Sequence, residues 1–235
     1  MKVTVVCFDI DGTLYPKWVT HYKLAASVFR SPWLALRYQK FRRQVRLDEE
    51  VKTVPENKAG FRLRQAAWLS KQPSHSEATK KMEKRIERQF YASWRHAFAK
   101  LKPYPLVRET MEQLKAMGVK IAALSDFPIE QKLVALGVDD LVDFACCSEE
   151  AGYLKPHPAP FLSVCEALGV SPENVLYVGD SCQKDIIGAK RVGMQTCLIA
   201  PQARRANKRK ELCPEAAFVC SDYKEFQEQI PKMLQ

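Results

Sequence analysis

The sequence lacks any run of about 18 consecutive apolar residues, the length that a membrane-spanning helix requires. It also has no CxxC pair, and none of its 4 histidines stands at a spacing typical of metal ligands. Its first residues enter an apolar run directly, without the basic segment and cleavage site of a secretory leader. From these absences we expect a soluble, unexported protein of the cytoplasm.

The 8 cysteines do not form the pattern of a disulfide framework. Cys7, Cys165 and Cys197 lie within apolar runs, where a free cysteine behaves as a small hydrophobic residue. We therefore predict reduced, mostly buried thiols, which agrees with the reducing conditions of the cytosol.

The positive charge is concentrated in one part of the chain. Residues 15–100 contain 20 Lys and Arg against 7 Asp and Glu, a net charge of +13, whereas the remaining residues have a net charge of −3. This difference suggests that the basic segment is a separate unit. Its charge fits an anionic substrate, a nucleic acid, an acidic membrane or a well-solvated surface. For the basic and aromatic stretch 31–46 we favour a solvated helix.

Residues 16–101 contain helical patterns and no strand pattern. Apolar residues recur at helical spacing in four stretches, at 20–29, 33–45, 60–72 and 76–101. The last stretch has an apolar stripe that repeats every four residues, formed by Met82, Ile86, Phe90, Trp94 and Phe98. We predict that this stripe packs against other helices and does not line a cofactor site.

The rest of the chain alternates short apolar strands with single helices. After a first strand at 3–8, strands are predicted at 119–124, 144–147, 175–178, 196–200 and 217–220. The helices between the later strands end at glycine, and the alternation predicts parallel βαβ units. The expected fold is therefore α/β, with a doubly wound parallel-sheet core (residues 1–14 and 102–235) and an inserted all-helical unit (residues 15–101). A basic stretch at 204–210 is predicted to be a solvated loop.

Polar residues follow four of the predicted strands. Ligands of an open parallel sheet bind at the carboxyl ends of its strands, so these residues are expected to meet at one edge. They are Asp9, Asp11, Gly12 and Thr13 after the first strand, Ser125 and Asp126 after the second, Lys155 after the third, and Asp180 and Asp185 after the fourth. Each motif alone has a structural explanation, such as a turn or a helix cap, but their convergence favours a catalytic site.

The chemistry that needs this set of residues is phosphoryl transfer. Its transition state spreads negative charge over the phosphoryl oxygens, which a lysine, a hydroxyl and backbone N–H groups stabilise. Several carboxylates together would repel a phosphate, so they imply a divalent cation, and hard oxygen ligands favour Mg²⁺. One aspartate can be a nucleophile that forms an aspartyl-phosphate, and the carboxylate two residues on can act as general acid and then base.

The motifs resemble those of the haloacid dehalogenase-like (HAD) superfamily of phosphohydrolases. They read DIDGT (9–13), LSD (124–126), KPHP (155–158) and GDSCQKDIIGAKRVGM (179–194), in the order and spacing of that family. The helical insert lies between the first and second motifs, where the family places one type of cap domain. The resemblance fades from about residue 16 to residue 101, the part that normally selects the substrate.

The resemblance implies a role for each motif residue. Asp9 is expected to be the nucleophile and Asp11 the general acid and base. The phosphate group is expected to be bound by Ser125, Asp126 and Lys155, together with Gly12 and Thr13. Mg²⁺ is expected to be bound by Asp9, the backbone carbonyl of Asp11, Asp180 and Asp185. The presence of Asp11 favours phosphate over carbon–halogen chemistry, because dehalogenases of the family do not keep this second acid.

The sequence thus predicts a Mg²⁺-dependent phosphomonoesterase that hydrolyses a small phosphorylated metabolite and needs no obligate protein partner. Two alternatives within the superfamily stay open: a phosphomutase, which returns the phosphoryl group to a sugar, and a phosphonatase, which uses a cap lysine as a Schiff-base amine. An alternative of another class is a nucleic-acid- or membrane-binding protein that uses the basic cap. Nucleic-acid binding of that kind would weaken steeply with salt.

Overall fold

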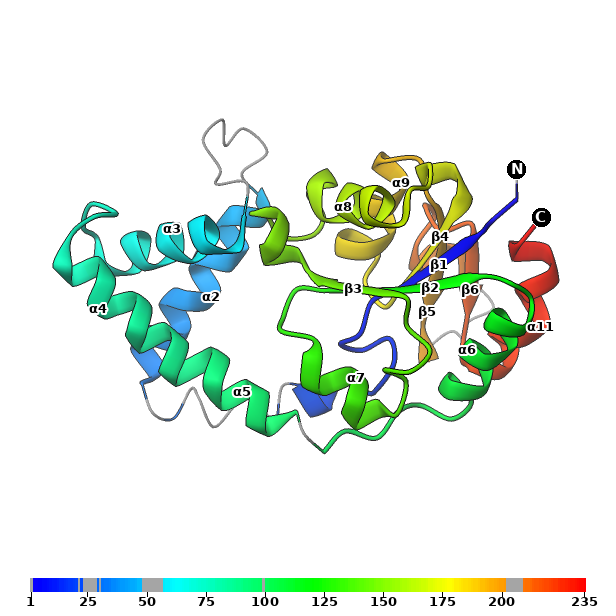
Figure 1. Ribbon diagram of the computed structural model, residues 1–235, viewed down its shortest axis with the longest axis horizontal. Coiled ribbons are helices and arrows are strands. Elements are labelled where there is room, and N and C mark those ends of the chain that lie inside the picture. Colours follow the sequence, from blue (N-terminus) through cyan, green and yellow to red (C-terminus); the bar gives the residue numbers. More distant parts are fainter. Residues whose placement is uncertain are drawn as a thin grey trace.

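The computed structural model describes residues 2–20, 22, 29, 31–47, 57–98, 100–201 and 209–235. A six-stranded parallel sheet forms its centre, in the order β3-β2-β1-β4-β5-β6 (Figure 1). The strands are β1 (Val5–Phe8), β2 (Lys120–Ser125), β3 (Phe144–Cys147), β4 (Val175–Gly179), β5 (Gln195–Ile199) and β6 (Phe218–Cys220). The predicted doubly wound α/β fold is confirmed, and each predicted strand is present.

Helices cover both faces of this sheet. Along β1, Val6 and Phe8 point to one face and Val5 and Cys7 to the other, as the two-residue period of a strand requires. In Figure 1, α8 (Pro158–Leu168) and α9 (Ile187–Arg191) lie on one side of the strands, and α6 (Val107–Ala116) and α11 (Tyr223–Met233) lie on the other. Two short helices, α7 (Glu130–Leu136) and α10 (Arg209–Leu212), complete this part of the chain. Since both faces are covered, the strands are apolar throughout.

The described residues between 16 and 101 contain helices and no strand. They include α2 (Pro32–Leu47), α3 (Lys58–Ser70), α4 (Glu77–Ile86) and α5 (Ala92–Ala97), and residues 17–20 are also helical. Residues 32–97 are called the helical segment below. This segment lies beside the sheet, next to the carboxyl ends of its strands (Figure 1). The predicted helix at 20–29 and the predicted loop at 204–210 lie largely outside the described residues.

The apolar stripe of residues 82–98 packs in the core, as predicted, but Phe90 and Trp94 also line a pocket beside the carboxyl ends of the strands. Ile86, Phe90, Trp94 and Phe98 are buried, and the rings of Phe90 and Tyr38 lie 4.4 Å apart. A π-helical turn, Glu87–Tyr91, joins α4 to α5. Residues four apart do not stay on one face of an α-helix, because the helix has about 3.6 residues per turn. The π-helical turn has more residues per turn and so keeps the stripe closer to one face.

The prediction that the cysteines are reduced is wrong for one pair. Cys182 and Cys213 form a disulfide, with their Cα atoms 5.6 Å apart, across 31 residues of sequence. The other six cysteines are free and buried, as expected. The pairing brings the start of the π-helical turn Cys182–Ile186 to the residue that follows α10, and no local spacing pattern marks it. In the described part of the chain, no helix is both long and apolar enough to cross a membrane.

Candidate active site

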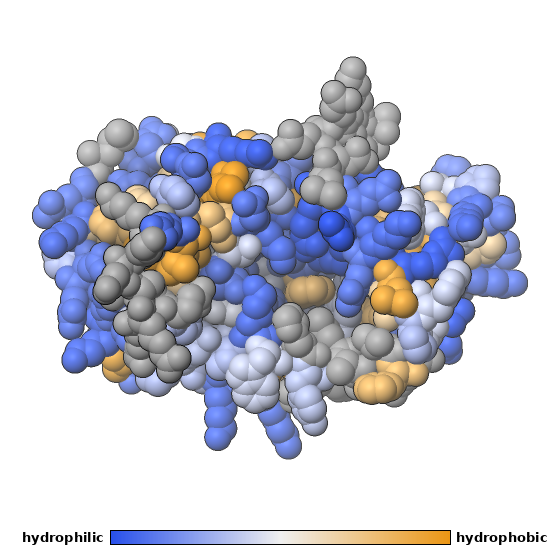
Figure 2. All heavy atoms as spheres, turned by 180° about the vertical axis from the view of Figure 1, so that it is seen from behind, coloured by the Kyte–Doolittle hydropathy of each residue, from blue (hydrophilic) through white to orange (hydrophobic). Residues whose placement is uncertain are grey.

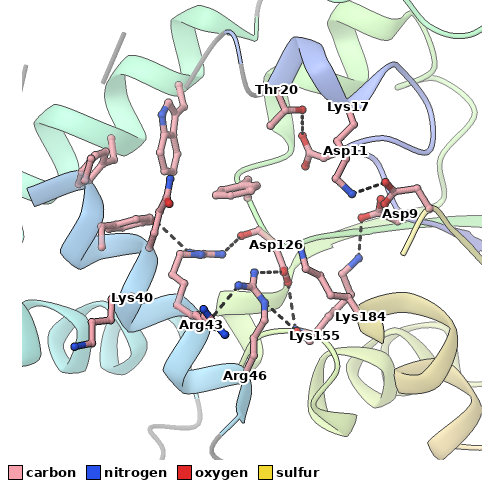
Figure 3. A pocket seen from close by; sticks show the side chains of 18 of the residues that line it. Asp9, Asp11, Lys17, Thr20, Lys40, Arg43, Arg46, Asp126, Lys155 and Lys184 are labelled. Carbon is pink, nitrogen blue, oxygen red and sulfur yellow. Dashed lines mark hydrogen bonds and ion pairs between the residues drawn. The ribbon is translucent and has the colours of Figure 1, made fainter. Parts of the chain in front are cut away.

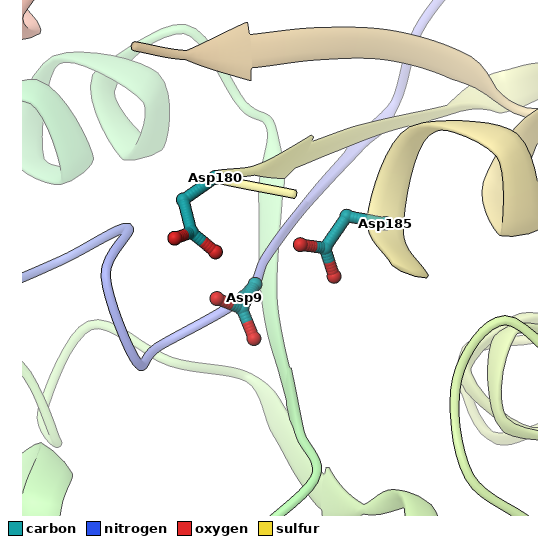
Figure 4. A group of neighbouring side chains, drawn as sticks. All are labelled: Asp9, Asp180 and Asp185. Atoms are coloured by element: carbon teal, nitrogen blue, oxygen red, sulfur yellow. The ribbon is translucent and has the colours of Figure 1, made fainter. Parts of the chain in front are cut away.

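The predicted site residues converge at the carboxyl edge of the sheet, around β1 and β4. These two strands are neighbours in the sheet but distant in sequence, so the strand order reverses between them. At such a switch point the loops that follow the two strands diverge and leave a crevice. Asp9 directly follows β1, and Asp180 directly follows β4, so their side chains meet there (Figure 4).

Asp9 is a buried carboxylate with one donor on each oxygen. The Nζ atom of Lys155 lies 2.7 Å from Oδ1, and the Thr13 hydroxyl donates a 2.9 Å hydrogen bond to Oδ2. Burial raises the pKa of Asp9 to about 6, although Lys155 opposes this shift; the nearby Asp185 and Asp11 add to it. The two donors fix the orientation of a carboxylate that a bound cation would keep ionised.

Lys155 links the carboxylates of this site. Its side chain is 2% exposed, and its Nζ atom also lies 2.6 Å from Asp185 Oδ1 and 2.9 Å from the Tyr177 hydroxyl. Burial alone would lower the pKa of Lys155, but Asp185 and Asp9 outweigh burial and hold the pKa well above its usual value. Lys155 is therefore a permanent cation that separates Asp9 from Asp185.

Three carboxylates form a group that could hold a metal ion. Asp9, Asp180 and Asp185 each offer an oxygen, and these oxygens lie within 4.8 Å of one another (Figure 4). Burial raises the pKa of Asp180 and the charge of Asp9 raises it further, while Lys17, at 2.6 Å, opposes the shift. The donor set is all oxygen and anionic, which fits a hard divalent cation such as Mg²⁺. The carboxylate of Asp11 points elsewhere and is not part of this group.

Two glycines leave room for the carboxylates of Asp180 and Asp185. Gly12 has a φ of +105°, and a Cβ atom there would lie 2.4 Å from Asp180 Oδ2. A Cβ atom on Gly179, the last residue of β4, would lie 2.4 Å from the Cβ atom of Asp185. Both positions lie in the predicted motifs, and their role is to leave room for the carboxylates.

Asp11 is held by four side chains. The Ser125 hydroxyl donates a 2.7 Å hydrogen bond to Oδ2, Lys132 Nζ lies 2.7 Å from Oδ1 and 2.6 Å from Oδ2, and the hydroxyl of Tyr15 donates to Oδ1. The Thr20 hydroxyl lies farther away, at 3.4 Å. Burial acts to raise the pKa of Asp11, but Lys132 and the hydroxyl donors outweigh burial, so the pKa is lowered. In this arrangement Asp11 is an ionised carboxylate, the form of a general base.

Asp126 connects two catalytic loops and does not face Asp9. Its Oδ2 atom lies 2.6 Å from Arg46 Nη2, and its Oδ1 atom accepts a 3.2 Å hydrogen bond from the backbone N–H of Lys155. Burial would raise the pKa of Asp126, but Arg46, Lys155 and Arg42 hold it well below its usual range. A carboxylate repels a phosphate, so only the backbone of Asp126 suits a phosphoryl oxygen.

Helix α2 docks on these loops through two arginines. Arg42 is buried; it forms an ion pair with the fully buried Glu149 and donates a 2.5 Å hydrogen bond to the backbone carbonyl of Asp126. Arg46 pairs with Asp126, and its Nε–H donates to the carbonyl of Lys155 at 3.2 Å. Tyr91 also donates to Glu149, at 2.9 Å. The prediction that 31–46 is a solvated helix is therefore wrong for the face that carries Arg42 and Arg46, whereas Lys40 and Arg43 are exposed.

A pocket lies between α2 and the strand ends (Figure 3). It has a volume of about 680 Å³. On the sheet side it is lined by Asp9, Asp11, Asp126, Lys155, Asp180 and Asp185, and on the α2 side by Leu36, Gln39, Lys40, Arg42, Arg43 and Arg46. The pocket thus joins the predicted site to the basic helix.

The sequence analysis did not predict Lys132, Arg42 and Arg46 as site residues. The positions of Lys132 and Arg42 on apolar helix faces could have indicated them. In α7, Lys132 shares the buried helix face with Ile129 and Leu136, at helical spacing. Similarly, Arg42 lies four residues after the buried Tyr38 on the apolar stripe of α2. A cation on the apolar face of a predicted helix indicates a buried acidic partner, here Asp11 and Glu149.

Comparison with known proteins agrees with this geometry. A family model for haloacid dehalogenase-like hydrolases matches residues 3–193. The chain is 33% identical over 209 residues to the glyceraldehyde 3-phosphate phosphatase of Methanopyrus kandleri, an alignment that covers 84% of each protein. It is 29% identical over 196 residues to the phosphoglycolate phosphatase of Haemophilus influenzae, covering 80% of this chain and 82% of that protein.

Solved structures share the whole fold. The HAD phosphatase from Thermococcus onnurineus has a TM-score of 0.58 at 24% identity, covering 100% of both chains. The 2-haloacid dehalogenase from Pseudomonas syringae pv. Tomato has a TM-score of 0.63 at 23% identity, covering 99% of this chain and 98% of that one. The family match along most of the chain and the similarity to the Methanopyrus kandleri phosphatase confirm the predicted resemblance: the protein belongs to the haloacid dehalogenase-like hydrolase family.

Proposed function

We propose that this protein is a Mg²⁺-dependent phosphomonoesterase that hydrolyses a small phosphorylated metabolite. Residues 1–14 and 102–235 would form the catalytic core, and residues 15–101 the cap domain that selects the substrate. A cytoplasmic location is part of the proposal. Two relatives are named as phosphatases of small phosphate esters, glyceraldehyde 3-phosphate and phosphoglycolate, which supports the substrate class.

The environment of Asp9 carries the proposal. One carboxylate oxygen contacts Lys155 and the other contacts Thr13, beside two further carboxylates, Asp180 and Asp185. A nucleophile needs this fixed orientation, and a phosphoryl group needs the cationic Lys155 next to it. Bound between the three carboxylates, Mg²⁺ would neutralise their charge and stabilise the charge that develops on the phosphoryl oxygens.

Two steps follow from the positions of Asp9 and Asp11. In the first, an Asp9 oxygen attacks phosphorus, the ester P–O bond breaks, and the leaving oxygen takes a proton from Asp11. In the second, a water molecule gives a proton to Asp11 and attacks phosphorus. The bond between Asp9 and phosphorus then breaks, which releases inorganic phosphate and restores both aspartates.

Asp11 must gain a proton before the first step. Its present donors favour the ionised form, and the Ser125 hydroxyl is one of them. When a phosphoryl group binds, Ser125 would exchange its hydrogen bond to Asp11 for one to a phosphoryl oxygen. Losing this donor raises the pKa of Asp11 and favours the acid form.

Phosphate release from a panel of phosphorylated metabolites, with Mg²⁺ or with a chelator, tests the proposal. Asp9→Asn keeps the shape of the side chain and removes the nucleophile, so release should fall at least about a thousandfold. Asp139→Asn is the matched control, because Asp139 is exposed and does not line the pocket. Release that needs no divalent cation, or that survives in Asp9→Asn, contradicts the mechanism. Phosphate transfer to a sugar without release of inorganic phosphate would indicate a mutase.

A further inference from the structure

The pocket is larger than phosphoryl transfer requires. Its volume of about 680 Å³ falls in the range of about 300–1,000 Å³ that is typical of whole small-molecule ligands. The phosphoryl group would occupy the end near Asp9 and Lys155. The space beside α2 is therefore available to the part of the substrate that is not transferred.

Each carboxylate that lines the pocket already has a cationic partner. The Nζ or Nη atom of a lysine or arginine lies within 2.7 Å of every one of them. The pairs are Asp9 with Lys155, Asp11 with Lys132, Asp126 with Arg46, Asp180 with Lys17, and Asp185 with Lys155. Lys155 serves two of these carboxylates, so four cations oppose five carboxylates, and the one remaining negative charge lies at the proposed metal site.

Three cations of the pocket have no such partner among the described residues. Lys40, Arg43 and Lys184 line the pocket, and their side chains form no hydrogen bond or ion pair with the described part of the chain. Lys40 and Arg43 come from α2, and Lys184 comes from the π-helical turn Cys182–Ile186 on the opposite wall. Lys184 is half-buried, so its charge is partly withdrawn from water. The uncompensated charge of the pocket is positive and comes from both walls.

The helical repeat of α2 places its free cations on the pocket side. Leu36, Lys40, Arg43 and Arg46 are three or four residues apart and share one face, which lines the pocket. Helix α2 contains no acidic residue that could neutralise them. On the face shown in Figure 2, hydrophilic residues predominate where the structure is described, with hydrophobic residues scattered among them. In Figure 3, Arg43 lies on α2 and Lys184 on the core side of the same pocket, and Lys40 lies on α2 at the edge, with its side chain pointing away from Asp9.

We propose that Arg43 and Lys184, with Lys40 at the edge, form a subsite for a second anionic group of the substrate. The preferred substrate would be a phosphomonoester that also carries a carboxylate or a second phosphoryl group on its untransferred part. Both groups match the charge of the subsite, and a guanidinium binds either of them through paired hydrogen bonds. This inference rests on the proposed phosphomonoesterase function.

Matched substrates test the subsite and distinguish the two anions. Glyceraldehyde 3-phosphate and 3-phosphoglycerate differ only in an aldehyde or a carboxylate, and the monophosphate and bisphosphate of propanediol differ only in a second phosphoryl group. The quantity measured is the ratio of kcat/KM for the anionic member of a pair to that for its partner. This ratio is determined for the wild type, Arg43→Gln, Lys184→Gln and the control Lys80→Gln. Lys80 is an exposed cation of α4 that does not line the pocket.

We expect the wild type to favour the anionic member of at least one pair by about tenfold or more, because charge-assisted hydrogen bonds are worth about that factor. Arg43→Gln and Lys184→Gln should each reduce the ratio about tenfold, and Lys80→Gln should leave it as in the wild type. A preference in the glyceraldehyde pair assigns a carboxylate, and one in the propanediol pair assigns a second phosphoryl group. Phosphate release with the same ratio in all four proteins overturns the subsite but leaves the phosphatase function intact. No release from these four compounds, with release from other members of the metabolite panel, also overturns the subsite, and no release from any member of the panel overturns both.

Discussion

The ammonium group of Lys132 lies 2.7 and 2.6 Å from the two carboxylate oxygens of Asp11, and it reaches them from a buried position. The same Nζ atom lies 4.5 Å from the centre of the Phe98 ring. A buried cation with one anionic partner fixes the orientation of that partner and lowers its pKa. Lys132 therefore determines where Asp11 points and how readily it gains a proton.

Replacing Lys132 should impair the acid–base steps. We expect Lys132→Met to lower kcat by about 10²- to 10⁴-fold, the usual contribution of a general acid or base, with a smaller change in KM. Without the cation the pKa of Asp11 rises, so the limb of the pH–rate profile that belongs to Asp11 moves to higher pH.

Lys132→Arg is the conservative control, because it keeps the charge on the same helix face. It should recover part of the lost kcat and return the pH profile toward that of the wild type. A profile that stays unchanged in Lys132→Met, while stability falls, would assign Lys132 a purely structural role.

The ion pair between Arg42 and Glu149 should be a major contributor to stability. Glu149 is 0% exposed and also accepts hydrogen bonds from Tyr91, so Glu149→Gln leaves Arg42 as an uncompensated buried charge. We expect the free energy of unfolding to fall by about 3–5 kcal/mol, measured by denaturant titration.

The neighbouring Glu150 provides the control for this experiment. Its ion pair with Lys58 is exposed and 3.5 Å long, so Glu150→Gln should change the free energy of unfolding by less than about 1 kcal/mol. Equal effects of the two variants would show that burial of Glu149 does not determine its contribution.

The sheet and its catalytic edge were predictable because their signals are local. Buried strands read as apolar runs, and helices such as Pro158–Leu168 end at a glycine with positive φ, here Gly169. The carboxyl ends of parallel strands lie at one edge of the sheet, so the residues that follow each strand are predicted to meet there. For this reason the sequence alone predicts that Asp9, Lys155, Asp180 and Asp185 lie at one edge of the sheet.

Contacts between residues far apart in the sequence were not predictable in the same way. Arg42 and Glu149 are 107 residues apart, and Lys132 and Asp11 are 121 residues apart. The disulfide of Cys182 and Cys213 is likewise set by tertiary proximity. Spacing rules apply only to residues that are close in sequence. The sequence therefore shows cations on apolar helix faces but does not show which acidic residues they pair with.

Gly12 should be essential for metal binding because it lies against Asp180, and not only because of its positive φ. A Cβ atom at Gly12 would lie 2.4 Å from Asp180 Oδ2, so Gly12→Ala should displace a carboxylate of the predicted metal site. We expect Mg²⁺ binding, measured by calorimetry, and Mg²⁺-dependent phosphate release both to be lost.

Gly118→Ala separates the two effects. Gly118 has a φ of +77° but no atom within 4 Å of an added Cβ, so the variant should lose only about 1–2 kcal/mol of stability and bind Mg²⁺ normally. If Gly12→Ala also binds Mg²⁺ normally, Asp180 does not contribute to the metal site as proposed.

His157 should make stability depend on pH. Its Nδ1 atom accepts a 3.1 Å hydrogen bond from the Ala159 N–H at the start of α8, and burial lowers the pKa of His157. The folded protein therefore binds the proton less readily than the unfolded chain, whose histidine titrates near pH 6.5. The stability that the neutral ring provides is complete above about pH 6.5 and is lost as the pH falls below it.

His157→Asn removes the titration and keeps a side-chain acceptor at the start of the helix. Its free energy of unfolding should therefore decrease less steeply than that of the wild type below about pH 6.5. Parallel curves for the two proteins would mean that His157 does not titrate differently in the folded state.

Trapping the covalent enzyme tests the central claim most directly. Asp11→Asn removes the base of the second step, and 4-nitrophenyl phosphate has a leaving group that needs no acid in the first, so the aspartyl-phosphate should accumulate. The reaction is quenched in acid, and the peptides are measured by mass spectrometry. The account predicts the added mass of one phosphoryl group on the peptide that contains Asp9, only when Mg²⁺ is present. A phosphoryl group on a different residue, or its appearance without a divalent cation, would contradict it.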